Sequence, residues 1–141
     1  MSQDYKSHKR FVPAFHFLLF GLILIVFVGA VVNFFTHGEG EFLQASLIIL
    51  ISVILIFLFF FTRIFSLKAQ NRAIRAEENF RHYVLTGKPL DNHLTIGQVI
   101  ALRFAPDEEF TTLAANAAAE KMSPDAIKQA IKNWKGDFHR V

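Results

Sequence analysis

The sequence contains no cysteine, which excludes disulfide bonds, thiolate metal sites and cysteine nucleophiles. Glycine and proline are also absent from the stretch between Glu41 and Thr86, which is followed by Gly87 and Pro89. These are the two residue types that most strongly disfavour a helix interior. We therefore expect one long helix here, with Gly87 as its stop signal. Whether it stays straight below the apolar part is left open by the sequence.

Charge is missing from Phe17–Phe35 and from the first half of the long helix, roughly Phe42–Phe61. Crossing hydrocarbon takes about 20 apolar residues, and a helix satisfies its own backbone hydrogen bonds there, so both stretches are predicted to be transmembrane helices. A cleavable signal peptide is the competing interpretation of the first, but no small-x-small cleavage site follows its apolar core. The link Thr36–Glu41 is too short to recross the bilayer, so we expect an antiparallel hairpin.

Basic residues lie on one side of this hairpin only. Lys6, Lys9 and Arg10 precede the first span, and the link between the spans has no Lys or Arg. The positive-inside rule then places both termini in the cytoplasm. A basic collar follows the second span and is expected to face anionic lipid, where each cation contributes about 1 kcal/mol; setting the topology is the alternative role of the same residues. The collar consists of Arg63, Lys68, Arg72 and Arg75.

From Ala69 onward, small and apolar residues recur every three or four positions, as on one face of a helix. We call this face the packing stripe and expect the later helices to pack on it. It consists of Ala69, Ala73, Ala76, Phe80 and Val84.

Three shorter helices are predicted beyond Pro89. Thr95 and Gln98 have the form of a capping box. Pro106 is followed by three carboxylates, which suit the positive end of a second helix. Ser123–Pro124 starts the last helix, which we expect to end at Gly136.

The predicted fold class is an all-α membrane protein with a two-helix transmembrane hairpin, whose long second helix extends into a small cytoplasmic helical bundle. The predicted domains are a cytoplasmic N-terminal tail over 1–16, the hairpin over 17–65 and a cytoplasmic helical domain over 66–141. About 75 residues bury only a modest core, so the last part is expected to need the membrane helix, a partner or self-association.

Three segments resemble a family of small two-span bacterial inner-membrane proteins of unknown function. They are QNRAIRAEENFRHYVLTGKPL over Gln70–Leu90, IALRFAPDEEF over Ile100–Phe110 and SPDAIKQAIKNWKGDFHRV over Ser123–Val141. The resemblance implies a multi-pass protein of the bacterial inner membrane. It brings no catalytic residue, because the family has no established activity.

The only cluster that suggests chemistry combines two carboxylates with basic residues and a histidine. Glu78 and His82 are four residues apart, as are Glu77 and Arg81, and this is the spacing of ordinary ion pairs on a helix surface. A di-metal bundle motif would need Glu and His three apart on two helices. Phosphate-binding glycine loops, nucleophile elbows and HExxH motifs are absent. We therefore predict no enzyme activity, no metal and no cofactor.

The composition and layout favour a non-enzymatic membrane-anchored scaffold or interaction module, either self-associating or an accessory subunit of a membrane complex. The alternative is a small oligomeric channel or transporter lined by Ser46 and Ser52, although neither span carries an ionisable residue in its middle. A third hypothesis is a membrane-tethered nucleic-acid binder, whose basic residues near the C-terminus would be Lys128, Lys132, Lys135, His139 and Arg140. It is disfavoured, because these lysines fit a solvated helix face and the net charge is only +3.

Overall fold

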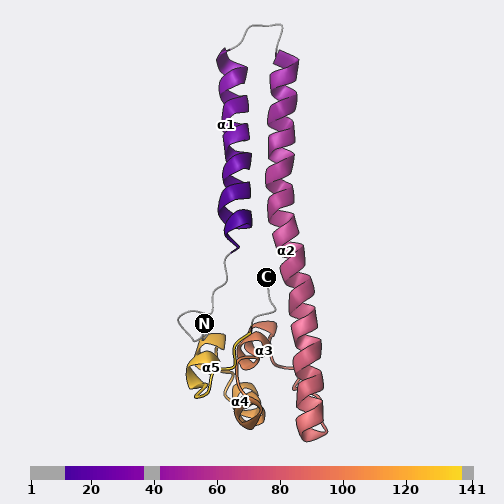
Figure 1. Cartoon of the computed structure of the whole chain (residues 1–141). Coiled ribbons are helices and arrows are strands. Elements are labelled where there is room, and N and C mark those ends of the chain that lie inside the picture. Colours follow the sequence, from indigo (N-terminus) through magenta and orange to yellow (C-terminus); the bar gives the residue numbers. More distant parts are fainter. Residues whose placement is uncertain (1–11, 37–41, 138–141) are drawn as a thin grey trace. The chain divides into compact units, whose positions relative to one another are not determined.

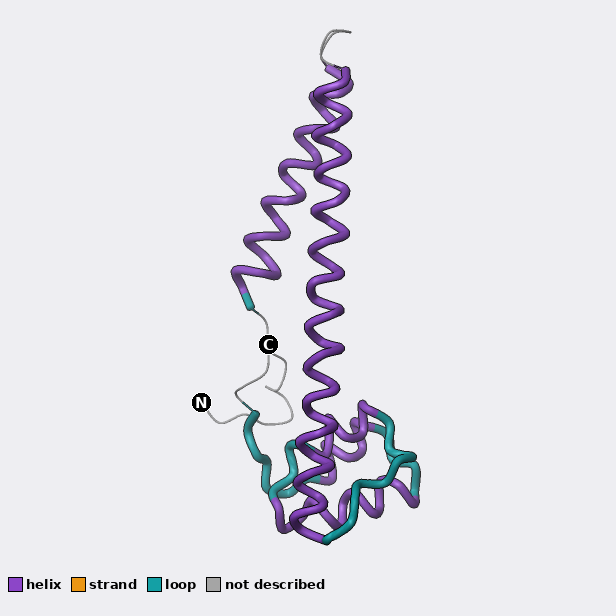
Figure 2. The backbone as a smooth tube through the Cα atoms, turned by 90° about the vertical axis from the view of Figure 1, so that its right-hand side faces the viewer, coloured by secondary structure: helices purple, strands orange, loops and turns teal. Residues whose placement is uncertain are grey.

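The computed structural model describes residues 12–36 and 42–137. Within these two ranges every regular element is a helix and no strand occurs (Figure 2). The described chain divides into two compact units, one ending at Ser66 and the other beginning at Leu67. The cations predicted to precede the first span and the link after Thr36 lie outside the described residues.

The first unit contains the first apolar helix and the apolar part of the second. A short π-helical segment, η1 (Ala14–Leu19), leads into α1 (Phe20–Thr36), and α2 (Phe42–Thr86) follows. Ala14–Thr36 and α2 are both long and apolar enough to cross a membrane. The first helix begins earlier than expected, directly after Pro13, because proline is tolerated in the first turn, where its missing N–H has no helical partner to lose.

Within this unit α1 and the first part of α2 run side by side (Figure 1) and are joined by phenylalanine contacts. The Phe15 and Phe59 ring centroids are 4.5 Å apart, and those of Phe34 and Phe42 are 4.4 Å apart. Small residues are buried in the same unit, namely Ala30, Ala45 and Ser52. Of the small or polar residues expected at this contact, Ala45 is buried and Asn33 and Ser46 are half-buried, whereas Gly29 and Gln44 are exposed.

α2 is a single helix from Phe42 to Thr86, without a break between Arg63 and Lys68. It ends at Gly87, which adopts a left-handed conformation with φ 72°. The Gly87 N–H donates to the Tyr83 carbonyl over 2.8 Å. The predicted stop at Gly87 is confirmed, because glycine enters this conformation without the steric cost of a Cβ atom.

The second unit combines the end of α2 with three short helices that pack on one another: α3 (Ile96–Leu102), α4 (Asp107–Ala119) and α5 (Pro124–Ala130). Both arms of the capping box between Thr95 and Gln98 are present, and Ser123 caps α5 through the Ala126 N–H. α3 and α5 approach closely at Gly97, where a Cβ would lie 3.2 Å from Pro124 Cγ. The core residues that are at most 5% exposed include Ile74, Leu90, Leu94, Val99, Leu102, Phe110, Ala117 and Ile127.

The prediction that the last helix runs to Gly136 is wrong, because α5 ends at Ala130. Tertiary contacts take over the backbone beyond that point. The Glu109 carboxylate accepts the backbone N–H groups of Lys132 and Asn133 at 2.9 and 3.0 Å. The Trp134 ring stacks on Phe104 at 4.6 Å between centroids. The two hydrogen bonds and the ring stack hold residues 131–137 against the core as a non-helical segment.

Candidate functional site

The packing stripe is exposed. Phe80 and Val84 are 68% and 66% exposed, and the three alanines are exposed as well. The buried face of α2 in this unit carries Ile74 and Glu78, which are 4% and 5% exposed. At 100° per residue the two faces are roughly 130° apart. The C-terminal helices therefore pack on the face with Ile74 and not on the stripe as expected, and the charged residues Glu78 and Arg81 on that face have partners there.

The basic collar is divided between the two units. Arg63 is half-buried in the first and lines a small hollow there with Phe15 and His16. The other three collar residues belong to the second unit, where Arg72 and Arg75 border a different hollow of about 280 Å³. The Arg75 guanidinium also donates to the Leu94 carbonyl. Contact of the collar with lipid stays a prediction.

The charged cluster on α2 connects it to the helices that follow. Arg81 pairs with Glu78 over 3.0 Å, donates from Nε to Asp107 over 2.7 Å and reaches the Ala105 carbonyl at 2.8 Å. Its guanidinium carbon lies 4.3 Å from the centre of the Phe110 ring. The pairs expected at a spacing of four residues, Glu77 with Arg81 and Glu78 with His82, are not the ones that form. Arg81 instead bonds to Asp107 on α4 and to Ala105 just before it.

A second arginine makes a similar connection. Arg103, just after α3, pairs with Glu77 of α2 at 3.2 Å and with Asp137 at 3.3 Å. His82 instead contacts the Lys88 carbonyl at 2.8 Å. The cluster is thus a structural network that holds α2, α3 and the C-terminal segment together. Sequence spacing indicated Glu77 and Arg81 but not their partners Arg103 and Asp107, each of which lies 26 positions further along the chain.

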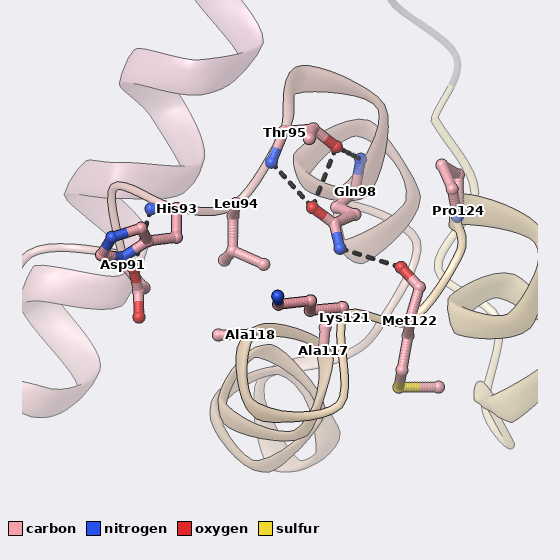
Figure 3. A pocket seen from close by; sticks show the side chains of 10 residues that line it. All are labelled: Asp91, His93, Leu94, Thr95, Gln98, Ala117, Ala118, Lys121, Met122 and Pro124. Carbon is pink, nitrogen blue, oxygen red and sulfur yellow. Dashed lines mark hydrogen bonds and ion pairs between the residues drawn. The ribbon is translucent and has the colours of Figure 1, made fainter.

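A groove runs along the second unit beside the C-terminal half of α4. It consists of two adjoining hollows of about 560 and 520 Å³ that share Asp91, Leu94 and Ala118. Figure 3 shows the larger hollow, between the segment before α3 and the end of α4. Its apolar lining comes from Leu94, Ala117, Ala118, Met122 and Pro124.

Most polar side chains around the larger hollow are already engaged. Gln98 accepts from the Thr95 N–H at 2.7 Å and donates to the Met122 carbonyl at 2.8 Å. Asp91 accepts from the backbone and ring of His93, at 2.8 and 2.9 Å. The backbone N–H of His93, and next its ring, lower the pKa of the Asp91 carboxyl. Lys121, which points into the hollow beside Leu94 (Figure 3), makes no ion pair or hydrogen bond with any residue that the structure describes.

Within the described ranges no group of three or more His, Cys, Asp or Glu side chains is placed to hold a metal ion. Over residues 1–141 the chain matches the family of unknown function DUF6526. The chain belongs to this family. No curated protein and no solved structure matches it. The match confirms the resemblance to a family of unknown function that the three sequence segments indicated.

No sequence pattern of this DUF6526 member indicates the groove or Lys121. The segment Ala117–Met122 has the composition of an ordinary helix end, with no glycine at the position that turns left-handed. The one useful signal was Ser123–Pro124, which starts α5 and leaves only a short link after α4. A short turn of this kind places the intervening side chains at a surface.

Proposed function

We propose that this chain is a two-span protein of the bacterial inner membrane, with both termini in the cytoplasm, that acts as a non-enzymatic interaction module by self-association. Two helices with the length and apolarity of spans support the membrane part. The observation that carries the proposal of self-association is the exposed packing stripe. It lies on the part of α2 that belongs to the second unit, where the opposite face of the helix, with Ile74 and Glu78, is already buried.

The large apolar side chains exposed on and beside the stripe favour a protein partner that would bury them. Besides Phe80 and Val84, Tyr83 beside the stripe is 56% exposed. Burying a large apolar side chain contributes about 1.5–3 kcal/mol. Small residues such as Ala73 and Ala76 also let two helix backbones approach closely, so that the larger side chains interlock.

A second copy of the chain is the partner that this geometry favours most. Copies inserted in one bilayer with the same topology hold identical stripes at the same distance from the membrane. Such stripes meet through a two-fold axis along the membrane normal, with each face self-complementary. Confinement to one membrane also raises the effective concentration of the stripes, so a modest interface is sufficient.

Disulfide crosslinking in native membranes tests this directly, because the chain has no cysteine of its own. Phe80→Cys and Ala76→Cys place a thiol on the stripe. Lys68→Cys is the matched control, about 120° away around the helix. Mild oxidation is expected to give a dimer from both stripe variants and little from the control, since a disulfide needs Cβ atoms within about 4.5 Å.

A dimer yield that is the same at position 68 would contradict the stripe as the interface. Crosslinking of the stripe cysteines to a different protein, and not to a second copy, would replace self-association by the role of an accessory subunit. Cysteines placed at His37 and Val141 test the topology in the same membranes. We expect a membrane-impermeant maleimide added from outside to label the first and not the second.

The channel and nucleic-acid hypotheses receive less support. Ser52, which would line the channel, is 0% exposed in the first unit and donates to the Ile48 carbonyl at 2.8 Å. Ser46 donates in the same way to Leu43. Lys128, one of the lysines assigned to nucleic acid, is half-buried and lies 3.7 Å from Asp125.

A further inference from the structure

The larger hollow of the groove beside α4 combines an apolar lining with the uncommitted ammonium of Lys121. Ala118 and Met122 are half-buried and Pro124 is exposed, so they form its accessible apolar lining, while the buried Leu94 and Ala117 support them from the core. The polar groups around them are occupied by the capping box and by the pair of Asp91 with His93. The Lys121 ammonium is therefore the group left to meet a ligand in the larger hollow.

The backbone holds Lys121 in a conformation that glycine would adopt with less strain. Its φ is 49°, the only positive value among the non-glycine residues that the structure describes. It follows the C-cap residue Glu120, and the Met122 N–H bonds back to the Ala117 carbonyl at 3.2 Å. This is the Schellman arrangement, in which glycine is the usual left-handed residue. A side chain retained at such a position is a reason to look for a function.

The charge around the groove favours an anion. Lys121 lines the larger hollow and Lys88 the smaller one, while the carboxylate shared by both, Asp91, already accepts two hydrogen bonds from His93. No arginine lines either hollow within the described residues, and the planar fork that suits phosphate is therefore missing. A single ammonium beside an apolar floor is better matched to one carboxylate.

We propose that this groove binds a carboxylate that carries an apolar chain. Lys121 pairs with the carboxylate, and the apolar chain lies on Leu94, Ala118 and Met122. The hollow of about 560 Å³ is within the size range of small-ligand sites. A fatty acid and the C-terminal carboxylate of an apolar peptide share this chemistry. The site is separate from self-association, because no residue of the packing stripe lines these two hollows.

Met122 provides a direct probe, since the chain has only two methionines, Met1 and Met122. The experiment uses the full chain in nanodiscs with ¹³C-methyl methionine, titrated with hexanoate or with its neutral analogue hexanamide. We expect hexanoate to shift the Met122 signal saturably while Met1 stays in place, and hexanamide to bind at least tenfold more weakly. Acetyl-Leu-Leu-Val with a free or an amidated C-terminus distinguishes a peptide source from a fatty acid.

Two variants assign the effect to the lysine. Lys121→Gln and Lys121→Gly are both expected to weaken hexanoate binding at least tenfold, and the glycine variant relieves the backbone strain, so it folds. Lys135→Gln is the matched control, an exposed lysine that lines neither hollow, and should bind as the parent does. An unmoved Met122 signal, or equal hexanoate affinity in the parent and the Lys121 variants, would overturn the proposal.

Discussion

The two faces of α2 beyond Leu67 differ in burial, and the more apolar face is not the buried one. One face carries the packing stripe, which is the more regularly apolar of the two, and it is exposed. The other mixes Ile74 with Glu78 and Arg81, and it is buried or half-buried. Charged residues on the second face find specific partners among the later helices, whereas the stripe has none inside the described chain. In this small unit, the face that packs internally is therefore the one whose charged residues have partners.

Arg81 gives the sharpest test of that difference. Arg81→Ala leaves Glu78, which is 5% exposed, without its cation and removes the bonds to Asp107 and Ala105. Breaking a pair at such a site is expected to cost about 3 kcal/mol of unfolding free energy. Unfolding of the full chain in detergent can be followed by the fluorescence of Trp134, the single tryptophan.

The control for this change is Arg72→Ala, an exposed arginine on the same helix. A surface substitution of this kind should change the unfolding free energy by less than about 0.5 kcal/mol. If both arginine variants lose the same stability, the charge network does not determine which face packs.

Ile74 and Val84 form a matched apolar pair on the two faces. Ile74 is 4% exposed and Val84 is 66% exposed. Ile74→Ala should cost about 2–3 kcal/mol, because it leaves a cavity in the core. Val84→Ala should cost less than about 0.5 kcal/mol in the monomer, measured at a detergent ratio that separates copies. A large loss from Val84→Ala under those conditions would mean that the stripe packs within the chain.

Local signals were read correctly from the sequence, and long-range ones were not. The capping box at Thr95, the cap at Ser123 and the stop at Gly87 depend on residues within a few positions of each other, so their patterns suffice. The partner of Glu77, in contrast, is Arg103, and it is selected by how the chain folds back. The same holds for the early end of α5, which Glu109 imposes from another helix.

The candidate sites show the same division. Helical periodicity placed the five stripe residues on one face, as a regular helix requires, but periodicity does not say whether a face meets the same chain or another. The groove depends on Leu94, Ala117 and Met122 meeting from three parts of the chain. No pattern within a single segment predicts such a meeting.

Lys121→Gly tests the second unit by stabilising it. Glycine should raise the unfolding free energy by about 1 kcal/mol, since a non-glycine residue in the left-handed conformation of Lys121 costs about that much. The thermal midpoint followed by Trp134 fluorescence measures the gain. Lys121→Ala serves as the control, because alanine removes the ammonium and keeps the Cβ strain. Equal midpoints for the glycine and alanine variants would show that charge, and not strain, sets the effect.

The smallest expected effect is that of acid. Low pH should weaken the contacts of the C-terminal segment, and through them the contacts on the buried face of α2. The backbone N–H of Lys132, followed by the contacts of Asn133, lowers the pKa of the Glu109 carboxyl below its ordinary 4.5. The folded pKa is therefore lower than the unfolded one, and the resulting stabilisation is complete above pH 4.5 and lost as the pH falls through the folded value. Protonation releases residues 131–137, and with them the Arg103 partner Asp137.

A red shift of Trp134 emission below that pH, before global unfolding, is the measurement, because the ring leaves its stack on Phe104. Glu109→Gln is the matched control, since its amide oxygen still accepts but carries no charge. Its Trp134 emission should be nearly independent of pH over the same range and should already be shifted slightly at neutral pH. A parent chain whose emission stays constant until global unfolding would mean that the Phe104 stack alone holds the segment. The buried face of α2 would then depend on its arginines and not on this carboxylate.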